Sequence, residues 1–273
     1  MLDSAMDANT IGALLALNTQ AHGLLFLIAL SGIRVTTIFL VLPAMSSQAV
    51  PGAVRAGACY LMTWFIAAGQ SPAAFENLTI PDMLLLTMKE AFIGLMIGYL
   101  ASIIFWIAES AGTLIDDLAG FNNVQMTNPM HGDQSTPVAS LLVQLTITLF
   151  HISGGMTVLL GVLFESYHWW PLISAVPDLG NAAASLAIDQ GNGMLSTAVK
   201  ICAPIMLTLV LIDVGLSIIG RAAGKLEPNS LSQPLRGLIG VVLLVAMIGA
   251  ISVQVRDAIH FTGFSSLLEK LRH

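Results

Sequence analysis

Long apolar runs separated by short polar connections dominate the hydrophobic pattern of this chain. Five stretches contain no Asp, Glu, Lys or Arg, and each is near the roughly 20 apolar residues that cross the hydrocarbon core of a bilayer. They lie between Asp7 and Arg34, Arg55 and Glu76, Glu90 and Glu109, Gln134 and Phe164, and Arg236 and Arg256. The pattern therefore predicts helices at membrane depth.

The apolar pattern predicts about six helical regions and little strand structure. We expect these regions at 11–42, 53–70, 83–118, 138–164, 194–220 and 235–260. The connections between them are rich in Pro, Gly and Asn, which mark turns. The expected fold is all-α, a multi-helix hydrophobic membrane-associated subunit made of packed helical hairpins. We expect one subunit over residues 1–273, with structural halves at about 1–165 and 166–273.

Composition supports the membrane class and excludes several others. The 273 residues are 56% apolar and 10% charged, whereas soluble domains carry about a quarter charged residues. The ten Lys and Arg form no basic patch, so nucleic acid is not an expected partner. No His or Cys spacing fits a metal site, and no Walker A, G-x-G-x-x-G or G-x-S-x-G motif occurs. We expect no enzymatic activity, cofactor or metal.

Basic residues give conflicting membrane orientations. By the positive-inside rule, Arg55 and the basic group at 221–236 place their two connections in the cytoplasm. With six simple spans, the basic tail at 270–272 would then lie on the opposite side. Either one region does not span, or assembly partners override the rule.

The run from Lys89 to Asp116 places small and acidic residues on one face of a helix. At about 100° per residue, eight positions fall within one arc. The pair Gly94 and Gly98 lets another backbone approach closely, and carboxylates at membrane depth meet cations or water. Two interpretations stay open: ordinary helix packing, or a subunit interface or polar conduit. The candidate interface or conduit stripe comprises Glu90, Gly94, Gly98, Glu109, Gly112 and Asp116.

The adjacent Asp116 and Asp117 invite a proton or metal site, since neighbouring carboxylates raise one another's pKa. Adjacent residues on a helix, however, point about 100° apart. We therefore expect a helix-end pair that meets solvent or a neighbouring subunit.

The segment 121–137 is the longest polar stretch between two strongly apolar regions. It contains Met126 and Met130, whose flexible side chains can seal an irregular gap. The alternative is an exposed connection in which the methionines have no special role.

Several short motifs occur in a characteristic order. They are Arg34 with Pro43 and Pro51; Lys89-Glu90 with Gly94 and Gly98; Glu109 with Gly112; Ile115-Asp116 with Gly120; Asn128-Pro129 with Gly132-Asp133-Gln134; Phe150 with Gly154-Gly155; Ser166 before Trp170-Pro171; Ala203-Pro204; Asp213 with Gly215; and Pro234-Leu235. Together they resemble the T component of the type III secretion export apparatus, the SctT and SpaR family, whose flagellar counterpart is FliR. The chain departs from the family pattern after Arg221, over 222–233, which favours an injectisome as the parent system.

The resemblance implies one T subunit that joins several R and S subunits in a pore at the bacterial inner membrane. The U and V components, membrane lipid and secreted proteins in transit are further implied partners, and the assembly rises partly above the bilayer. The family also places a T-subunit loop near the lumen, where it keeps the closed gate tight. By position, 121–137 is the candidate pore-closing loop, with Phe121, Met126, Asn128, Pro129, Met130 and Gln134.

Two other function classes compete with an export gate. Glu90, Glu109 and Asp213 at membrane depth suggest an ion-coupled small-solute transporter. Such transporters often consist of two related halves with broken helices, and this sequence shows no such repeat. A membrane scaffold without a lumen would use the G-x-x-x-G face but would not need the polar methionine loop.

Overall fold

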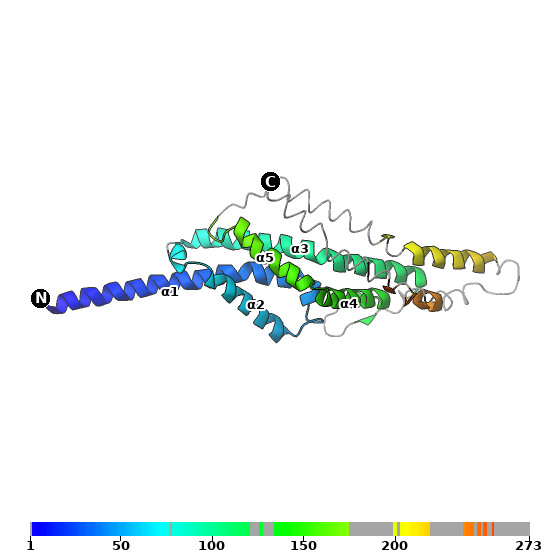
Figure 1. The fold of residues 1–273 in the computed structure, drawn as a ribbon, viewed down its shortest axis with the longest axis horizontal. Coiled ribbons are helices and arrows are strands. Elements are labelled where there is room, and N and C mark those ends of the chain that lie inside the picture. Colours follow the sequence, from blue (N-terminus) through cyan, green and yellow to red (C-terminus); the bar gives the residue numbers. More distant parts are fainter. Residues whose placement is uncertain are drawn as a thin grey trace. The chain divides into compact units, whose positions relative to one another are not determined.

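The computed structural model of this chain is helical, which confirms the predicted all-α class (Figure 1). It describes residues 2–76, 78–120, 126–127, 134–174, 199–200, 203–218, 237–242, 245–246, 248–249 and 253. The labelled helices are α1 (Leu2–Val41), η1 (Pro43–Met45), α2 (Gly52–Ala68), η2 (Pro72–Phe75), α3 (Ile80–Ala119), α4 (Pro137–Ile152) and α5 (Gly155–Trp169). A further helix covers Ala203–Ile218. Two short strands, β1 (Met126–Thr127) and β2 (Gln134–Ser135), pair antiparallel.

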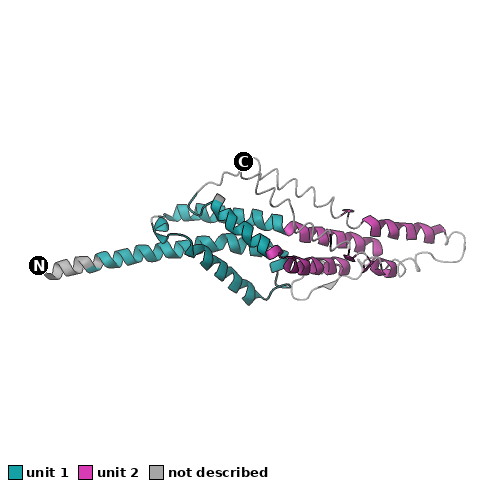
Figure 2. Ribbon diagram, in the orientation of Figure 1, with its two compact units in different colours: residues 1–101, 157–180 teal, residues 102–156, 181–273 magenta. Residues whose placement is uncertain are grey.

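The chain folds into two compact units, and each unit combines two stretches of the sequence (Figure 2). Unit 1 is Met1–Ala101 with Thr157–Gly180, and unit 2 is Ser102–Met156 with Asn181–His273. The long helix α3 contributes to both. The expected halves at about 1–165 and 166–273 stay a prediction.

The core of unit 1 forms where α1, α2, η2, α3 and the end of α5 meet. Leu27, Leu30, Phe75, Leu86 and Leu172 are at most 3% exposed and pack in one cluster. These residues come from separate segments of the sequence, so hydrophobic burial closes the unit around them.

The glycine pair of the predicted stripe packs against α1 of the same chain. A Cβ on Gly94 would lie 2.7 Å from the carbonyl oxygen of Arg34, and one on Gly98 would lie 3.3 Å from the Cα of Ile38. A Cβ at Gly94 would clash with the backbone of α1, and one at Gly98 would fit only if its neighbours shifted by a few tenths of an ångström. The two residues therefore set the distance between α1 and α3.

In unit 2, α3 packs against α4. The rings of Phe105 and Phe150 meet edge to face with centroids 5.4 Å apart. A Cβ on Gly112 would overlap the backbone of Ala139, so this glycine also marks a close helix contact. Farther along the chain, Gly240 lies against Ala119 of α3.

The expected single helical region 138–164 is broken, which corrects the sequence prediction. Helix α4 ends at Ile152, and α5 begins at Gly155. Between them Gly154 has φ 81°, a left-handed conformation that glycine adopts at helix ends. The ring of Phe150 fills the space next to Gly155, where a side chain would clash. The Gly-Gly pair therefore stops one helix and starts the next.

Fewer helices are long enough to cross a membrane than the six apolar regions suggest. In the described part of the chain, Gly12–Val41 and Ile80–Ala119 meet the length and hydropathy requirement, and α4 with α5 would add a third as a broken span. Helix α2 has 17 residues. At about 1.5 Å per residue it reaches roughly 25 Å, less than the ~30 Å hydrocarbon core.

We predict that Gly94→Val destabilises the protein by about 1–3 kcal/mol, because the added atoms must push α1 away from α3. Gly57→Val in α2 is the matched control, since a Cβ there meets nothing within 4 Å. Thermal unfolding in detergent, followed by tryptophan fluorescence, measures the difference. Equal melting temperatures for the two variants would show that the close contact is not needed.

Candidate functional site

A buried ion pair lies at the centre of unit 1. The Arg34 side chain on α1 and the Glu90 side chain on α3 are both 0% exposed. Arg34 Nε donates to Glu90 Oε2 at 2.7 Å, and Nη2 donates to Oε1 at 3.0 Å. This two-pronged geometry is the strongest that a guanidinium makes with a carboxylate.

A second cation, Lys89, joins the pair. Its Nζ lies 2.8 Å from Glu90 Oε1. It also donates to the carbonyl oxygens of Pro171, Leu172 and Ser174 at 2.8, 3.1 and 3.0 Å. Two cations thus surround one carboxylate, and the cluster holds one excess positive charge.

The end of α5 compensates for this excess. Arg34 Nη1 donates to Ser166 Oγ at 2.8 Å, and Nη2 donates to the carbonyl oxygen of Trp170 at 3.0 Å. The guanidinium carbon lies 3.9 Å from the centroid of the Tyr167 ring. Carbonyl groups at a helix C-terminus carry partial negative charge, and an aromatic face attracts a cation. Backbone carbonyl oxygens and the Tyr167 ring therefore balance the two cations together with Glu90.

The cluster binds three helices and the segment after α5 into one arrangement. We name it the Arg34 cluster: Arg34, Lys89, Glu90, Ser166, Tyr167 and the carbonyls of 170–174. A buried ion pair contributes little net stability, but removing one partner leaves an uncompensated charge that strongly destabilises the fold. In this packing of α1, α3 and α5, Arg34 bonds to Glu90, Ser166 and Trp170, and Lys89 bonds to Glu90 and the segment after α5.

Asp116 has a different role from the one its sequence suggested. It is 0% exposed and does not form a solvent-facing pair with Asp117. Its carboxylate accepts from the backbone N–H of Val138 at 3.0 Å and of Ala139 at 3.1 Å. These are the first free donors of α4, and Thr136 at the N-cap makes no side-chain cap. Asp116 therefore caps α4 from the neighbouring helix.

The predicted pore-closing loop is described only near its ends. Met126 pairs with Ser135 and Thr127 with Gln134, so β1 and β2 form the base of a hairpin. Phe121, Asn128, Pro129 and Met130 lie outside the described residues. On either side of the loop in the sequence, the Asp116 bonds hold the end of α3 to the start of α4.

The acidic stripe divides into separate sites. Glu90, Gly94 and Gly98 face α1, and Gly112 and Asp116 face α4, whereas Glu109 is exposed. The structure thus does not bring the three acids together. Whether the stripe also forms an interface or conduit stays a prediction.

Sequence reasoning missed Arg34, Ser166, Tyr167 and Trp170 as members of the site. The available signal was that Arg34 and Glu90 each stand at the edge of an apolar run at membrane depth, where charges need partners. The pairing itself spans 56 positions in the sequence.

Comparison with known proteins identifies the family of this chain. The family model for bacterial export proteins, family 1, matches residues 25–261. The chain belongs to this family. The match confirms the resemblance that the motifs predicted.

Family members of several systems are similar over most of their length. Yop proteins translocation protein T of Yersinia pestis is 31% identical over 213 residues, which cover 78% of this chain and 82% of the relative. SpaR of Salmonella typhimurium is 26% identical over 257 residues, 92% and 94% of the two chains. The flagellar biosynthetic protein FliR of Bacillus subtilis is 25% identical over 243 residues, 88% and 91%.

We predict that Glu90→Gln costs about 3–5 kcal/mol of stability, because Arg34 and Lys89 lose their shared counter-charge. Glu109→Gln removes the same charge from an exposed position of the same helix and should change stability by about 0.5 kcal/mol or less. Denaturant unfolding in detergent compares the two. A Glu90→Gln variant as stable as Glu109→Gln would refute the role of the cluster.

A second pair of substitutions tests whether Asp116 caps α4. Asp116→Ala should destabilise by about 1–2 kcal/mol, since two N–H groups of α4 lose their acceptor. Asp117→Ala, on the exposed side of the same turn, serves as the control. Hydrogen exchange at Val138 and Ala139 should accelerate only in the first variant; unchanged protection there would contradict the capping role.

Proposed function

We propose that this chain is a non-enzymatic subunit of the export gate of a type III protein secretion system in the bacterial inner membrane. With R and S components it forms the pore through which unfolded proteins are secreted. The observation that carries the proposal is the family match over 25–261, which covers most of the chain. Energy for export comes from other components, and this chain acts through its packing.

The outer surface supports assembly with lipid or partner subunits. Helix α2 exposes Tyr60, Trp64 and Phe65 at 75%, 68% and 68%, and α3 exposes Leu84 and Met88 at 62% and 64%. Large apolar patches of this kind mark membrane or protein contacts. The chain therefore presents apolar faces on two helices that its own core does not cover.

Two buried acids, Glu90 and Asp116, are used within the fold, which favours a gate subunit over an ion-coupled transporter. Glu90 is occupied by Arg34 and Lys89, and Asp116 by the N–H groups of α4. A coupling site needs a carboxylate that exchanges its cation, whereas these two serve the fold. The named relatives are a Yop proteins translocation protein, a surface presentation of antigens protein and a flagellar biosynthetic protein.

Within the gate, the loop 121–137 helps close the channel. Support comes from the contacts at its two ends. Strand β1 pairs with β2, and the Asp116 hydrogen bonds hold the end of α3 to the start of α4, so both ends of the loop are fixed. A loop with a fixed base can return to one position after substrate has passed. Met126 and Met130 then supply flexible apolar contacts that seal the lumen.

We predict that deleting residues 128–131, which leaves Gly132 and Asp133 as a two-residue connection between β1 and β2, makes the assembled complex leak small ions. The double variant Met126→Ser with Met130→Ser should leak less than the deletion but more than wild type. Met62→Ser with Met156→Ser removes two half-buried methionines elsewhere and is the control. Ion flux across the inner membrane is the measurement, with co-purification of the partner subunits as proof of assembly.

Unchanged ion flux in an assembled deletion complex would refute the gating role. Secretion of a reporter substrate distinguishes the export gate from the remaining alternative, a membrane scaffold. A scaffold without a lumen would tolerate the deletion in both assays.

A further inference from the structure

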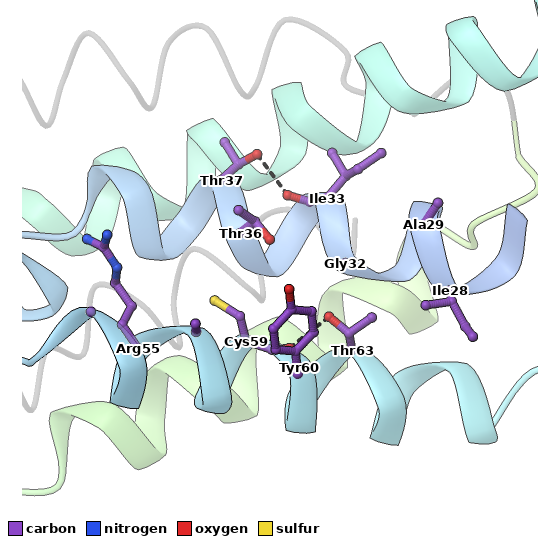
Figure 3. A pocket seen from close by; sticks show the side chains of 12 residues that line it. Ile28, Ala29, Gly32, Ile33, Thr36, Thr37, Arg55, Cys59, Tyr60 and Thr63 are labelled. Atoms are coloured by element: carbon purple, nitrogen blue, oxygen red, sulfur yellow. Dashed lines mark hydrogen bonds between the residues drawn. The ribbon is translucent and has the colours of Figure 1, made fainter. Parts of the chain in front are cut away.

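A groove lies between α1 and α2 in unit 1, and the Arg34 cluster makes no use of it (Figure 3). Its volume is about 590 Å³. Ile28, Gly32 and Thr36 line it from α1, and Arg55, Cys59 and Thr63 line it from α2. The two helices lie close together at Gly32, where a Cβ would lie 3.1 Å from Thr63 Oγ1.

The walls of this groove are apolar in effect, although three threonines line it. Thr37 Oγ1 donates to the carbonyl oxygen of Ile33 at 2.8 Å, and Thr63 Oγ1 donates to that of Cys59 at 2.8 Å. Both hydroxyls are thus satisfied within their own helices. The groove therefore favours hydrocarbon over a polar ligand.

One end of the groove carries a cation. Figure 3 shows Arg55 at one end and Ile28 at the other. Arg55 is half-buried, and Nη1 donates to the carbonyl oxygen of Met45 at 3.3 Å. No Asp or Glu lines the groove, and within the described residues no salt bridge joins Arg55 to a carboxylate. A guanidinium has five donors, so it can bind an anion while keeping this bond.

The dimensions match one half of a bilayer. From Ile28 to Thr37 the groove follows α1 for nine residues, or roughly 14 Å at about 1.5 Å per residue. Half of the ~30 Å hydrocarbon core is of similar length. Helix α1 over Gly12–Val41 is also long and apolar enough to cross a membrane.

We propose that this groove binds an anionic phospholipid, with an acyl chain along Ile28, Gly32 and Thr36 and the phosphate at Arg55. The apolar wall and the single terminal cation complement the two parts of such a molecule. Guanidinium binds phosphate by paired charge-assisted hydrogen bonds. A partner helix in the groove would have no need of the cation.

The test uses the full chain purified with its export-apparatus partners. Phosphatidylglycerol and phosphatidylcholine, each with a photoactivatable acyl chain, are cross-linked in turn and mapped by peptide mass spectrometry. Both lipids carry a phosphate, but the choline cation of phosphatidylcholine cancels the charge of its headgroup and repels a guanidinium. We expect phosphatidylglycerol to label 28–36 and 52–63 about tenfold more strongly than phosphatidylcholine, because only phosphatidylglycerol presents a net negative headgroup to Arg55.

Substitutions test whether Arg55 binds the lipid phosphate. Arg55→Gln should lower phosphatidylglycerol labelling about tenfold, and Arg55→Lys, which keeps the charge but loses the paired hydrogen bonds, should lower it less. Lys200→Gln removes an exposed cation elsewhere and should leave labelling unchanged. Ala56→Leu fills the groove and should lower labelling by both lipids.

Equal labelling by the two lipids, or unchanged labelling in Arg55→Gln, would overturn the proposal. A photo-crosslinker at Tyr60 provides an independent readout. If it captures a partner subunit and no lipid, a protein helix occupies the groove and the proposal is wrong.

Discussion

The contact between Arg34 and Glu90 determines how unit 1 packs. The Arg34 side chain reaches Glu90, while its backbone oxygen touches the face of Gly94, one turn farther along α3. The glycine sets the distance between α1 and α3 at which the guanidinium forms both hydrogen bonds to the carboxylate. Lys89 then extends the network to the segment after α5. An arrangement that separated Arg34 from Glu90 would leave a buried charge unpaired, which is costly.

The same combination of a small residue and an acid occurs again in unit 2. Gly112 lets α4 come close, and Asp116, one turn later, binds the N-terminal N–H groups of that helix. Helix α3 therefore uses its acidic stripe twice for packing within the chain. Its other face exposes apolar side chains such as Leu84 and Met88, which are available to lipid or sister subunits. One helix therefore carries both the internal contacts and an exposed apolar face.

Local patterns predicted the elements well, and long-range chemistry poorly. The apolar runs indicated α1 and α3, because helix formation at membrane depth follows hydrophobicity. The pairing of Arg34 with Glu90 and the capping by Asp116 were not predictable, since they join residues 56 and 22 positions apart. The break at Gly154 had a local signal, the Gly-Gly pair, but the packing of Phe150 against Gly155 is seen only in the fold. The loop positions Phe121 and Met130 lie outside the described residues.

The central claim is that this fold exists to join an export gate. Native mass spectrometry of the tagged chain, extracted in mild detergent from cells that express its neighbouring secretion genes, tests it most directly. The account predicts one discrete complex that contains a single copy of this chain with several copies of two smaller hydrophobic partners. A lone monomer or a homodimer, obtained while those partners are expressed, would contradict it.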